Sequence, residues 1–347
     1  MAGKRKFQVA LIGTDSLRGK EIKNILGSKK FPLSHIEFYD ADVQEEFGKL
    51  TDFQGEPRVI HSPSGDSLEG LDLVFLASDK ETNLKIGRLA GEKNFRAIDL
   101  TGAFSGQGDI PLVVAGVNDS ILASKPPSLI ANPHPVTIIL SSLLHRLISR
   151  LGIAKAVAFV LQPVSAFEES GIEELASQSA AMLSGASPNK EVFRDQVAFN
   201  ILSHTDAPDA NGFSSGERRI ISEVKRVLGL PALPLSLSVI QAPVFHAYSI
   251  MAYVEPEAKT NIQDLERLYR ESPLFKIGAP SPSCSVTCLS VAGKEQIFIG
   301  QIKKEESFPN AFWIWTVADN LTRGSALNAL EIARILYGAK TGERASK

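Results

Sequence analysis

The sequence predicts an α/β protein: a Rossmann-type domain built on a parallel sheet, plus an α+β domain with a mixed sheet. Short apolar runs alternate with helical patterns through the first 100 residues, which favours parallel strands with right-handed crossovers. After Asn132 longer strand patterns dominate. The 347 residues exceed one ordinary core. We therefore expect two domains, residues 1–131 with 324–347 and residues 132–323.

Five strands and three helices are expected in the first domain. Short apolar runs predict the strands at residues 7–12, 35–40, 59–61, 73–77 and 96–100. Apolar residues at helical spacing predict helices at 20–26 and 82–93. A last helix at 325–337 has apolar positions suited to packing on this domain, so both chain ends should complete it.

The second domain should contain five longer strands and four helices. The strands are predicted at residues 156–161, 237–244, 246–254, 296–300 and 311–317. Three helices are predicted at 171–183, 215–228 and 262–269, and Pro135 suits the first turn of another. These strands carry more apolar residues than one core needs, which predicts a homodimer through their sheet.

Composition excludes several classes of partner. The formal net charge of −2 gives no electrostatic reason to bind nucleic acid or an anionic membrane. No apolar run is long enough to cross a bilayer, and the start leads directly into a strand pattern, so a cytoplasmic location is expected. Cys284 and Cys288 lack neighbouring ligands, so we expect ordinary thiols and no metal site.

A strand-to-helix turn bracketed by Gly13 and Gly19 could hold a dinucleotide pyrophosphate, although Ser16 replaces the glycine that permits close approach. Asp40 is placed to accept hydrogen bonds from a ribose, and with Asp42 it would repel a 2′-phosphate. Glycines needed for geometry alone and a solvated acidic loop are the alternatives. The candidate cofactor-binding residues here are Gly13, Thr14, Ser16, Leu17, Gly19 and Asp40.

Several motifs along nearly the whole chain resemble the aspartate-semialdehyde dehydrogenases. Besides the Gly13 turn, they lie at residues 99–104, 110–118, 132–133, 162–165, 198–200, 242–244 and 319–329. Within that family the chain is most similar to a divergent bacterial branch, the Usg proteins. The resemblance implies an NAD(P)-binding domain and a second domain for dimerisation and substrate binding.

The reactive groups that the resemblance implies are missing. The family's nucleophilic cysteine corresponds to Pro135, and its histidine base corresponds to Tyr248. No thiol remains to form a covalent intermediate, and a phenol is a poor base at neutral pH. The two arginines that bind the substrate carboxylate and phosphate correspond to Ser105 and Gln241.

Other positions of the family's site are retained. Gln162 is unchanged, Glu217 matches a substrate-binding glutamate, and Arg219 stands where a lysine is usual. Asn320 resembles a contact to the nicotinamide side of the cofactor. His134 and His246 are alternative bases, and Ser141 and Ser165 are alternative hydroxyl nucleophiles without an evident base. The candidate substrate-cleft residues are Asn132, Gln162, Ser165, Glu217, Arg219 and Gln241.

The sequence therefore predicts a non-catalytic or repurposed relative of a semialdehyde dehydrogenase. NAD or NADP and a small acidic metabolite are the expected ligands, with NADP disfavoured because no cation compensates the carboxylates near Asp40. One alternative is an NAD(P)-dependent oxidoreductase with non-covalent chemistry, in which Tyr248 or a histidine donates a proton. A heterodimer partner of a catalytic homologue is another.

Overall fold

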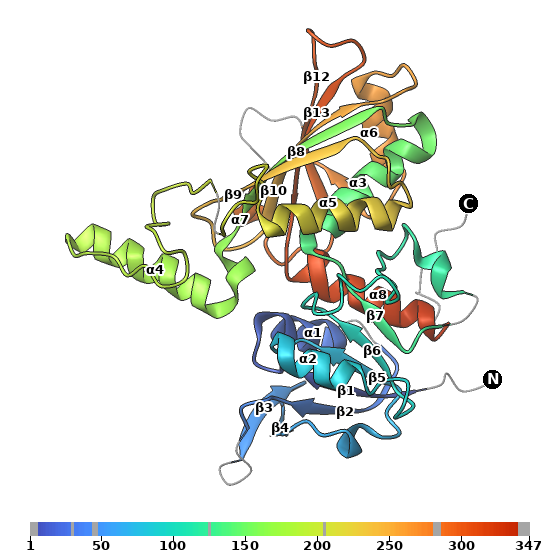
Figure 1. Cartoon of the computed structure of the whole chain (residues 1–347), viewed down its shortest axis with the longest axis vertical. Helices are drawn as coiled ribbons and strands as arrows, with labels where there is room; N and C mark the ends of the chain where they lie inside the picture. Colours follow the sequence, from blue (N-terminus) through green and yellow to red (C-terminus); the bar gives the residue numbers. More distant parts are fainter. Residues whose placement is uncertain are drawn as a thin grey trace. The chain divides into compact units, whose positions relative to one another are not determined.

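The computed structural model describes residues 6–28, 31–43, 48–123, 126–203, 206–279 and 286–338 (Figure 1). Contacts divide the chain into two compact units, Met1–His134 with Ser325–Lys347 and Pro135–Gly324. The first unit therefore includes Asn132, which we expected in the second. Two hydrogen bonds hold Asn132 in the first unit. Its amide donates to the carbonyl of Asp99 at 2.8 Å, and its side chain accepts from Asn328 at 2.7 Å.

The first unit contains a seven-stranded sheet in the order β3-β4-β2-β1-β5-β6-β7. The five predicted strands are present, with somewhat different ends, and β3 and β7 are additional. The strands are β1 Phe7–Ile12, β2 Leu33–Tyr39, β3 Lys49–Phe53, β4 Glu56–His61, β5 Leu73–Leu76, β6 Arg96–Asp99 and β7 Leu129–Ala131.

One edge of the sheet departs from the expected parallel arrangement. Strand β3 pairs with β4 antiparallel, through the two-residue turn Gln54-Gly55. Both turn residues have positive φ, 58° and 81°, which suits the twist of a tight hairpin. The sequence of β3 alternates exposed and buried positions over only five residues, a short pattern that apolar runs do not reveal.

Helices α1 Leu17–Ser28, α2 Lys80–Gly87 and α8 Leu327–Leu336 complete the first unit, with short 3-10 helices at Asp66–Leu68 and Asp119–Leu122. Helix α2 ends at Gly87, before the predicted residue 93. Apolar side chains of α8, including Leu327 and Leu330, join Leu11 and Phe75 in one core. Residues near the C-terminus thus pack on the sheet that begins near the N-terminus.

The second unit contains a six-stranded sheet in the order β11-β12-β13-β10-β8-β9. Strand β10 is antiparallel to β8 and β13, whereas β8 and β9 are parallel, so the predicted mixed sheet is confirmed. The strands are β8 Lys155–Gln162, β9 Leu235–Gln241, β10 Tyr248–Glu255, β11 Phe275–Ile277, β12 Ile297–Lys304 and β13 Phe312–Ala318.

The strand predictions were too long between β9 and β10. Residues 242–247 are not in either strand, and Ala247 has a φ of 72°, a left-handed conformation that an extended strand does not contain. The chain turns here, and β10 begins at the next residue. This turn places Tyr248 at the start of a strand whose neighbours are β8 and β13.

Helices cover one face of the second sheet. The helices of this unit are α3 Pro135–Leu151, α4 Glu168–Ser184, α5 Ser215–Leu228, α6 Ile262–Arg270 and the short α7 Cys288–Val291, with a 3-10 helix at Val164–Phe167. Helices α3, α5 and α6 share a buried core with the sheet (Figure 1). Pro135 is the first residue of α3, as predicted. A π-helical turn, Thr322–Ala326, precedes α8.

None of the helices in the described ranges is long and apolar enough to span a membrane. The same residues contain no group of three or more histidine, cysteine or acidic side chains placed to hold a metal ion.

Candidate functional site

The two glycines of the strand-to-helix turn are required by close packing. A Cβ atom on Gly13 would lie 2.3 Å from the Ser78 amide nitrogen, and one on Gly19 would lie 2.0 Å from the Gly13 carbonyl oxygen. Gly13 also has a φ of 89°. Close contacts with the chain after β5, at Gly13, and within the turn, at Gly19, thus account for both glycines without a bound nucleotide.

The Ser16 hydroxyl forms hydrogen bonds within the turn. Its hydroxyl donates to the Gly13 carbonyl at 2.8 Å and accepts from the Gly19 amide at 3.0 Å, just before α1 begins at Leu17. The hydroxyl therefore caps an N–H group of the first helical turn. Thr14 is buried and donates to the carbonyl of Tyr39 at 3.2 Å, which ties the turn to the end of β2.

Asp40 follows β2, where the sequence placed it, but its surroundings correct one expectation. The ammonium nitrogen of Lys49 lies 3.4 Å from Asp40 Oδ2, 3.3 Å from Asp42 Oδ1 and 2.8 Å from Asp15 Oδ2. A compensating cation is thus present, contrary to our expectation. Lys49 was not recognised from the sequence because it belongs to β3, a strand that was not predicted.

Burial and neighbouring charge shift the pKa values of Asp40 and Lys49. Burial raises the pKa of Asp40, and the nearby Asp15 carboxylate adds to the rise, while Lys49 opposes it. The hydrogen bond to Asp15 raises the pKa of Lys49 above its usual value. Lys49 therefore stays charged, and Asp40 is a carboxylate that its surroundings make costly to ionise.

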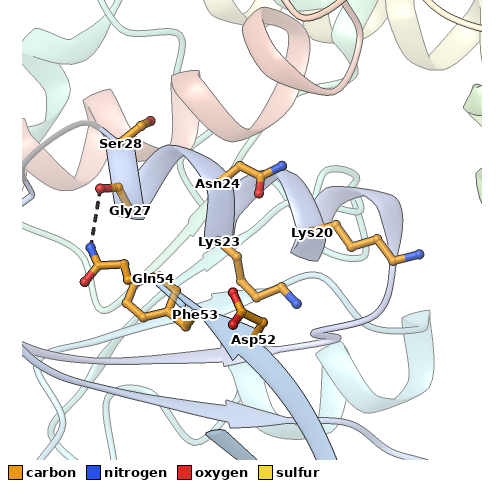
Figure 2. A pocket seen from close by; sticks show the side chains of 8 residues that line it. All are labelled: Lys20, Lys23, Asn24, Gly27, Ser28, Asp52, Phe53 and Gln54. Atoms are coloured by element: carbon orange, nitrogen blue, oxygen red, sulfur yellow. Dashed lines mark hydrogen bonds between the residues drawn. The ribbon is translucent and has the colours of Figure 1, made fainter. Parts of the chain in front are cut away.

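A cavity of about 700 Å³ lies beside α1 and β3 and contains none of the predicted site residues. Figure 2 shows Lys20 and Lys23 projecting from α1, with Asp52 on β3 opposite. Lys23 donates to the Thr51 hydroxyl at 2.5 Å, and burial lowers its pKa. At Gly27 the lining of the cavity is held together by a hydrogen bond that the Gln54 side chain donates to the Gly27 carbonyl.

In the second unit, three predicted positions form one hydrogen-bonded cluster. Gln162 donates to Gln241 Oε1 at 3.1 Å, and the Tyr248 hydroxyl donates to Gln162 Oε1 at 3.2 Å. Gln241 in turn donates to the carbonyls of Gln162 and Ala242, each at 3.0 Å. Gln241 and Tyr248 are each only 1% exposed. Adjacent strands β8, β9 and β10 bring these residues together.

Ser165 and Asn320, which we assigned to different ligands, contact one another. The Asn320 amide donates to Ser165 Oγ at 3.1 Å, and its Oδ1 accepts from the Ala247 backbone amide at 3.0 Å. Both side chains are buried. Asn320 therefore supports the left-handed turn before Tyr248, a structural role that the expected cofactor contact did not include.

Glu217 is occupied by backbone groups. It forms a capping box with Ser214 at the start of α5, accepting from the Ser214 amide at 2.8 Å. Its other oxygen accepts from the Val239 amide on β9 at 2.7 Å. A carboxylate held at both oxygens by the backbone anchors α5 to the sheet.

Arg219 is held by a glutamate that the sequence analysis missed. Its Nε donates to Glu223 Oε1 at 2.7 Å, and Glu223 Oε2 accepts from the Thr137 hydroxyl at 2.7 Å. Thr137 lies two residues after Pro135. The spacing of four residues on one helix was a signal that could have revealed the pair.

The remaining candidates lie in local contacts. Ser105 donates to the carbonyl of Gly102, and Asn132 is buried against Asn328, another residue that we missed. The Cys288 thiol lies 3.2 Å from the Ser249 hydroxyl, whereas Cys284 lies outside the described residues. Ser141 is buried, and its hydroxyl has no hydrogen-bond partner among the described residues.

Comparison with known proteins matches both units. Residues 144–323 match the dimerisation domain of the semialdehyde dehydrogenases, and residues 8–124 match their NAD-binding domain. Among relatives, aspartate-semialdehyde dehydrogenases of Rickettsia bellii and Aquifex aeolicus are 29% and 26% identical; the matches cover 96% and 95% of this chain and 98% of each relative. The chain belongs to the aspartate-semialdehyde dehydrogenase family.

Solved structures agree with this membership. Aspartate-semialdehyde dehydrogenase II of Vibrio cholerae, in complex with ASA, has a TM-score of 0.88 at 25% identity. A probable aspartate-semialdehyde dehydrogenase of Pseudomonas aeruginosa has a TM-score of 0.89 at 26% identity. Both matches cover 96% of this chain and 99% of the other. The two-domain α/β fold of the family, with its mixed second sheet, is thereby confirmed.

Proposed function

We propose that this family member cannot carry out the phosphorylating oxidation of a semialdehyde and is a non-catalytic or repurposed paralogue of the Usg type. The observation that carries the proposal is the pair of residues at the reactive positions, Pro135 and Tyr248. Pro135 offers no nucleophile at the start of α3, and the Tyr248 hydroxyl donates to Gln162 inside the second unit. That buried bond also counts against Tyr248 as the proton donor of another oxidoreductase.

The arginines that would bind the substrate carboxylate and the phosphate are missing as well. Ser105 and Gln241 stand at the arginine positions, and Gln241 is buried with amide and carbonyl partners. Arg219 stands where the family usually has a lysine, and Glu223 fixes its orientation. We therefore propose that the second unit binds at most a small acidic metabolite with one anionic group at Arg219.

We further propose that the first unit binds NAD weakly and in preference to NADP. Asp40 can accept from the hydroxyls of an adenosine ribose, which supports nucleotide binding. Ser16 already caps the Gly19 amide, which weakens pyrophosphate binding at the turn. Three carboxylates around one ammonium disfavour a 2′-phosphate.

A homodimer in the cytoplasm completes the proposal. The second unit matches a dimerisation domain, and its sheet face opposite α3 bears Phe159, which is 46% exposed. Light scattering at micromolar concentration should give twice the chain mass, and Phe159→Asp should shift the protein toward the monomer. A wild-type protein that is monomeric throughout would contradict the dimer.

The catalytic proposal is tested by assaying NADPH formation from aspartate semialdehyde and phosphate. The wild-type protein should match a buffer control. Pro135→Cys combined with Tyr248→His should also remain close to inactive, because charge-assisted contacts worth about 1.5–3 kcal/mol each are still absent. Turnover by the wild-type protein at an ordinary enzymatic rate would refute the loss of function. Turnover by the double variant alone would show that substrate recognition survives.

A further inference from the structure

Lys49 joins two segments that border the proposed nucleotide position. Asp15 belongs to the strand-to-helix turn, and Asp40 and Asp42 follow β2. The ammonium group of Lys49, at the first residue of β3, contacts a carboxylate oxygen of each within 3.4 Å. The Lys49 side chain is one-third exposed, so the ammonium can reach solvent.

Asp40 differs from the other two carboxylates. Its side chain is 7% exposed, whereas those of Asp15 and Asp42 are 47% and 78% exposed. Its Oδ2 atom is fully covered and accepts no hydrogen bond from any residue that the structure describes. The ammonium nitrogen of Lys49 lies 3.4 Å from this oxygen, which is longer than an ordinary charge-assisted hydrogen bond. A buried acceptor without a hydrogen bond is destabilising, so a ligand that donates a hydrogen bond to it gains binding free energy.

We propose that Lys49 is a displaceable plug of the ribose-binding position, with its ammonium group in front of Asp40 where the hydroxyls of a ribonucleoside would bind. Binding exchanges the loose contact to Asp40 for hydroxyl donors. The ammonium remains paired with Asp15 and Asp42, which are exposed and closer to it. This inference rests on the proposed nucleotide binding and adds the residue that controls access to it.

If Lys49 is displaced in this way, a cation can lie beside Asp40 without favouring NADP over NAD. A neutral pair of hydroxyls replaces the ammonium on Asp40 without adding charge. A 2′-phosphate would instead face three carboxylates with a single ammonium among them, so repulsion persists. An uncharged ribonucleoside is therefore the cleanest probe, because its binding reports displacement without a change in net charge.

Adenosine binding to the full-length chain, measured by NMR titration, tests the plug. The Lys49→Met variant should bind adenosine about two- to five-fold more tightly than wild type, because the contact between Lys49 and Asp40 no longer has to be broken; this change corresponds to about 0.4–1 kcal/mol. Lys49→Arg should restore wild-type affinity. 2′-Deoxyadenosine, which lacks one hydroxyl, should show no comparable gain.

Lys93→Met is the matched control. Lys93 also lies between two carboxylates of the first unit, 3.0 Å from Asp66 and 3.7 Å from Glu69. Its removal should leave adenosine affinity unchanged, and thermal melts should confirm that each variant folds. If NAD binds to the wild type but Lys49→Met leaves adenosine affinity unchanged or weaker, the plug is wrong and nucleotide binding stands. If neither protein binds adenosine or NAD, both proposals fail.

Discussion

The polar groups of the first unit's site and those of the second unit's site are satisfied in different ways. In the second unit, Gln162 bonds Gln241 and accepts from Tyr248, while Glu217 is occupied by two backbone amides. In the first unit, Asp40 keeps a buried oxygen without a hydrogen bond, beside a loosely placed Lys49. The polar side chains of the second unit thus satisfy one another within a closed network, whereas Asp40 in the first unit keeps an acceptor without a hydrogen bond among the described residues.

This difference separates groups that stabilise the fold from groups available to a ligand. A ligand that bound to Gln241 would have to break bonds that the protein makes with itself, at about 0.5–1.5 kcal/mol each. A ligand that bound to Asp40 would satisfy an acceptor that the fold leaves without a hydrogen bond among the described residues. The comparison therefore places an acceptor open to a ligand in the first unit and side chains engaged by the fold in the second.

The largest expected effect tests whether the glycine turn is required by packing. Gly19→Ala should lower the free energy of unfolding by about 3 kcal/mol, because the added carbon meets the Gly13 carbonyl at 2.0 Å. Gly106→Ala is the control, since a carbon there meets nothing within 4 Å. Urea unfolding of both variants measures the difference. Equal stabilities would mean that the turn is free to move and that its glycines serve another purpose.

Glu217 tests whether the second-unit network is structural. Glu217→Ala removes the acceptor of the Ser214 and Val239 amides, so the free energy of unfolding should fall by about 2 kcal/mol. Ser222→Ala, an exposed change on the same helix, should alter it by less than about 0.5 kcal/mol. If Glu217→Ala leaves stability intact but abolishes binding of a small acid, the glutamate is a ligand-binding residue instead.

Tyr248 gives a smaller effect within the same network. Tyr248→Phe should cost about 1 kcal/mol, because the hydroxyl bond to Gln162 is lost. Combined with Gln162→Ala in a double-mutant cycle followed by urea unfolding, the two losses should be less than additive. Strictly additive losses would show that the two side chains are not coupled, and the closed network would be refuted at this point.

Asp40 should give the smallest effect on stability, and its sign depends on pH. Because the folded protein raises the pKa of Asp40, the protonated acid is favoured by folding, and this stability is lost as pH rises above the ordinary range of the carboxyl group. Asp40→Asn should therefore raise Tm at pH 7 and converge with wild type as pH falls below 4. Asp42→Asn, at an exposed site, should not change Tm. A lower Tm for Asp40→Asn at pH 7 would mean that the Lys49 pair outweighs burial.

Patterns local in the sequence determined much of the fold. Apolar periodicity located the central strands of both sheets and helices such as α5, which spans its predicted residues 215–228. It did not find β3, whose five residues alternate too briefly, or the break at Ala247, whose positive φ no residue pattern announces. The residues at positions 135 and 248 were also read from the chain alone, because an amino-acid identity needs no geometry to be recognised.

Only the tertiary structure decided how these side chains are used. Lys49 reaches Asp15 and Asp40 through strand pairing at the sheet edge, and Glu217 reaches Val239 because α5 packs on β9. Such contacts join residues many positions apart, and a local pattern of apolar and polar residues does not encode the partner. The sequence by itself determined the family, the central elements of both sheets and the residues that stand at positions 135 and 248. Whether each polar side chain meets another part of the protein or stays open to a ligand depends on long-range packing.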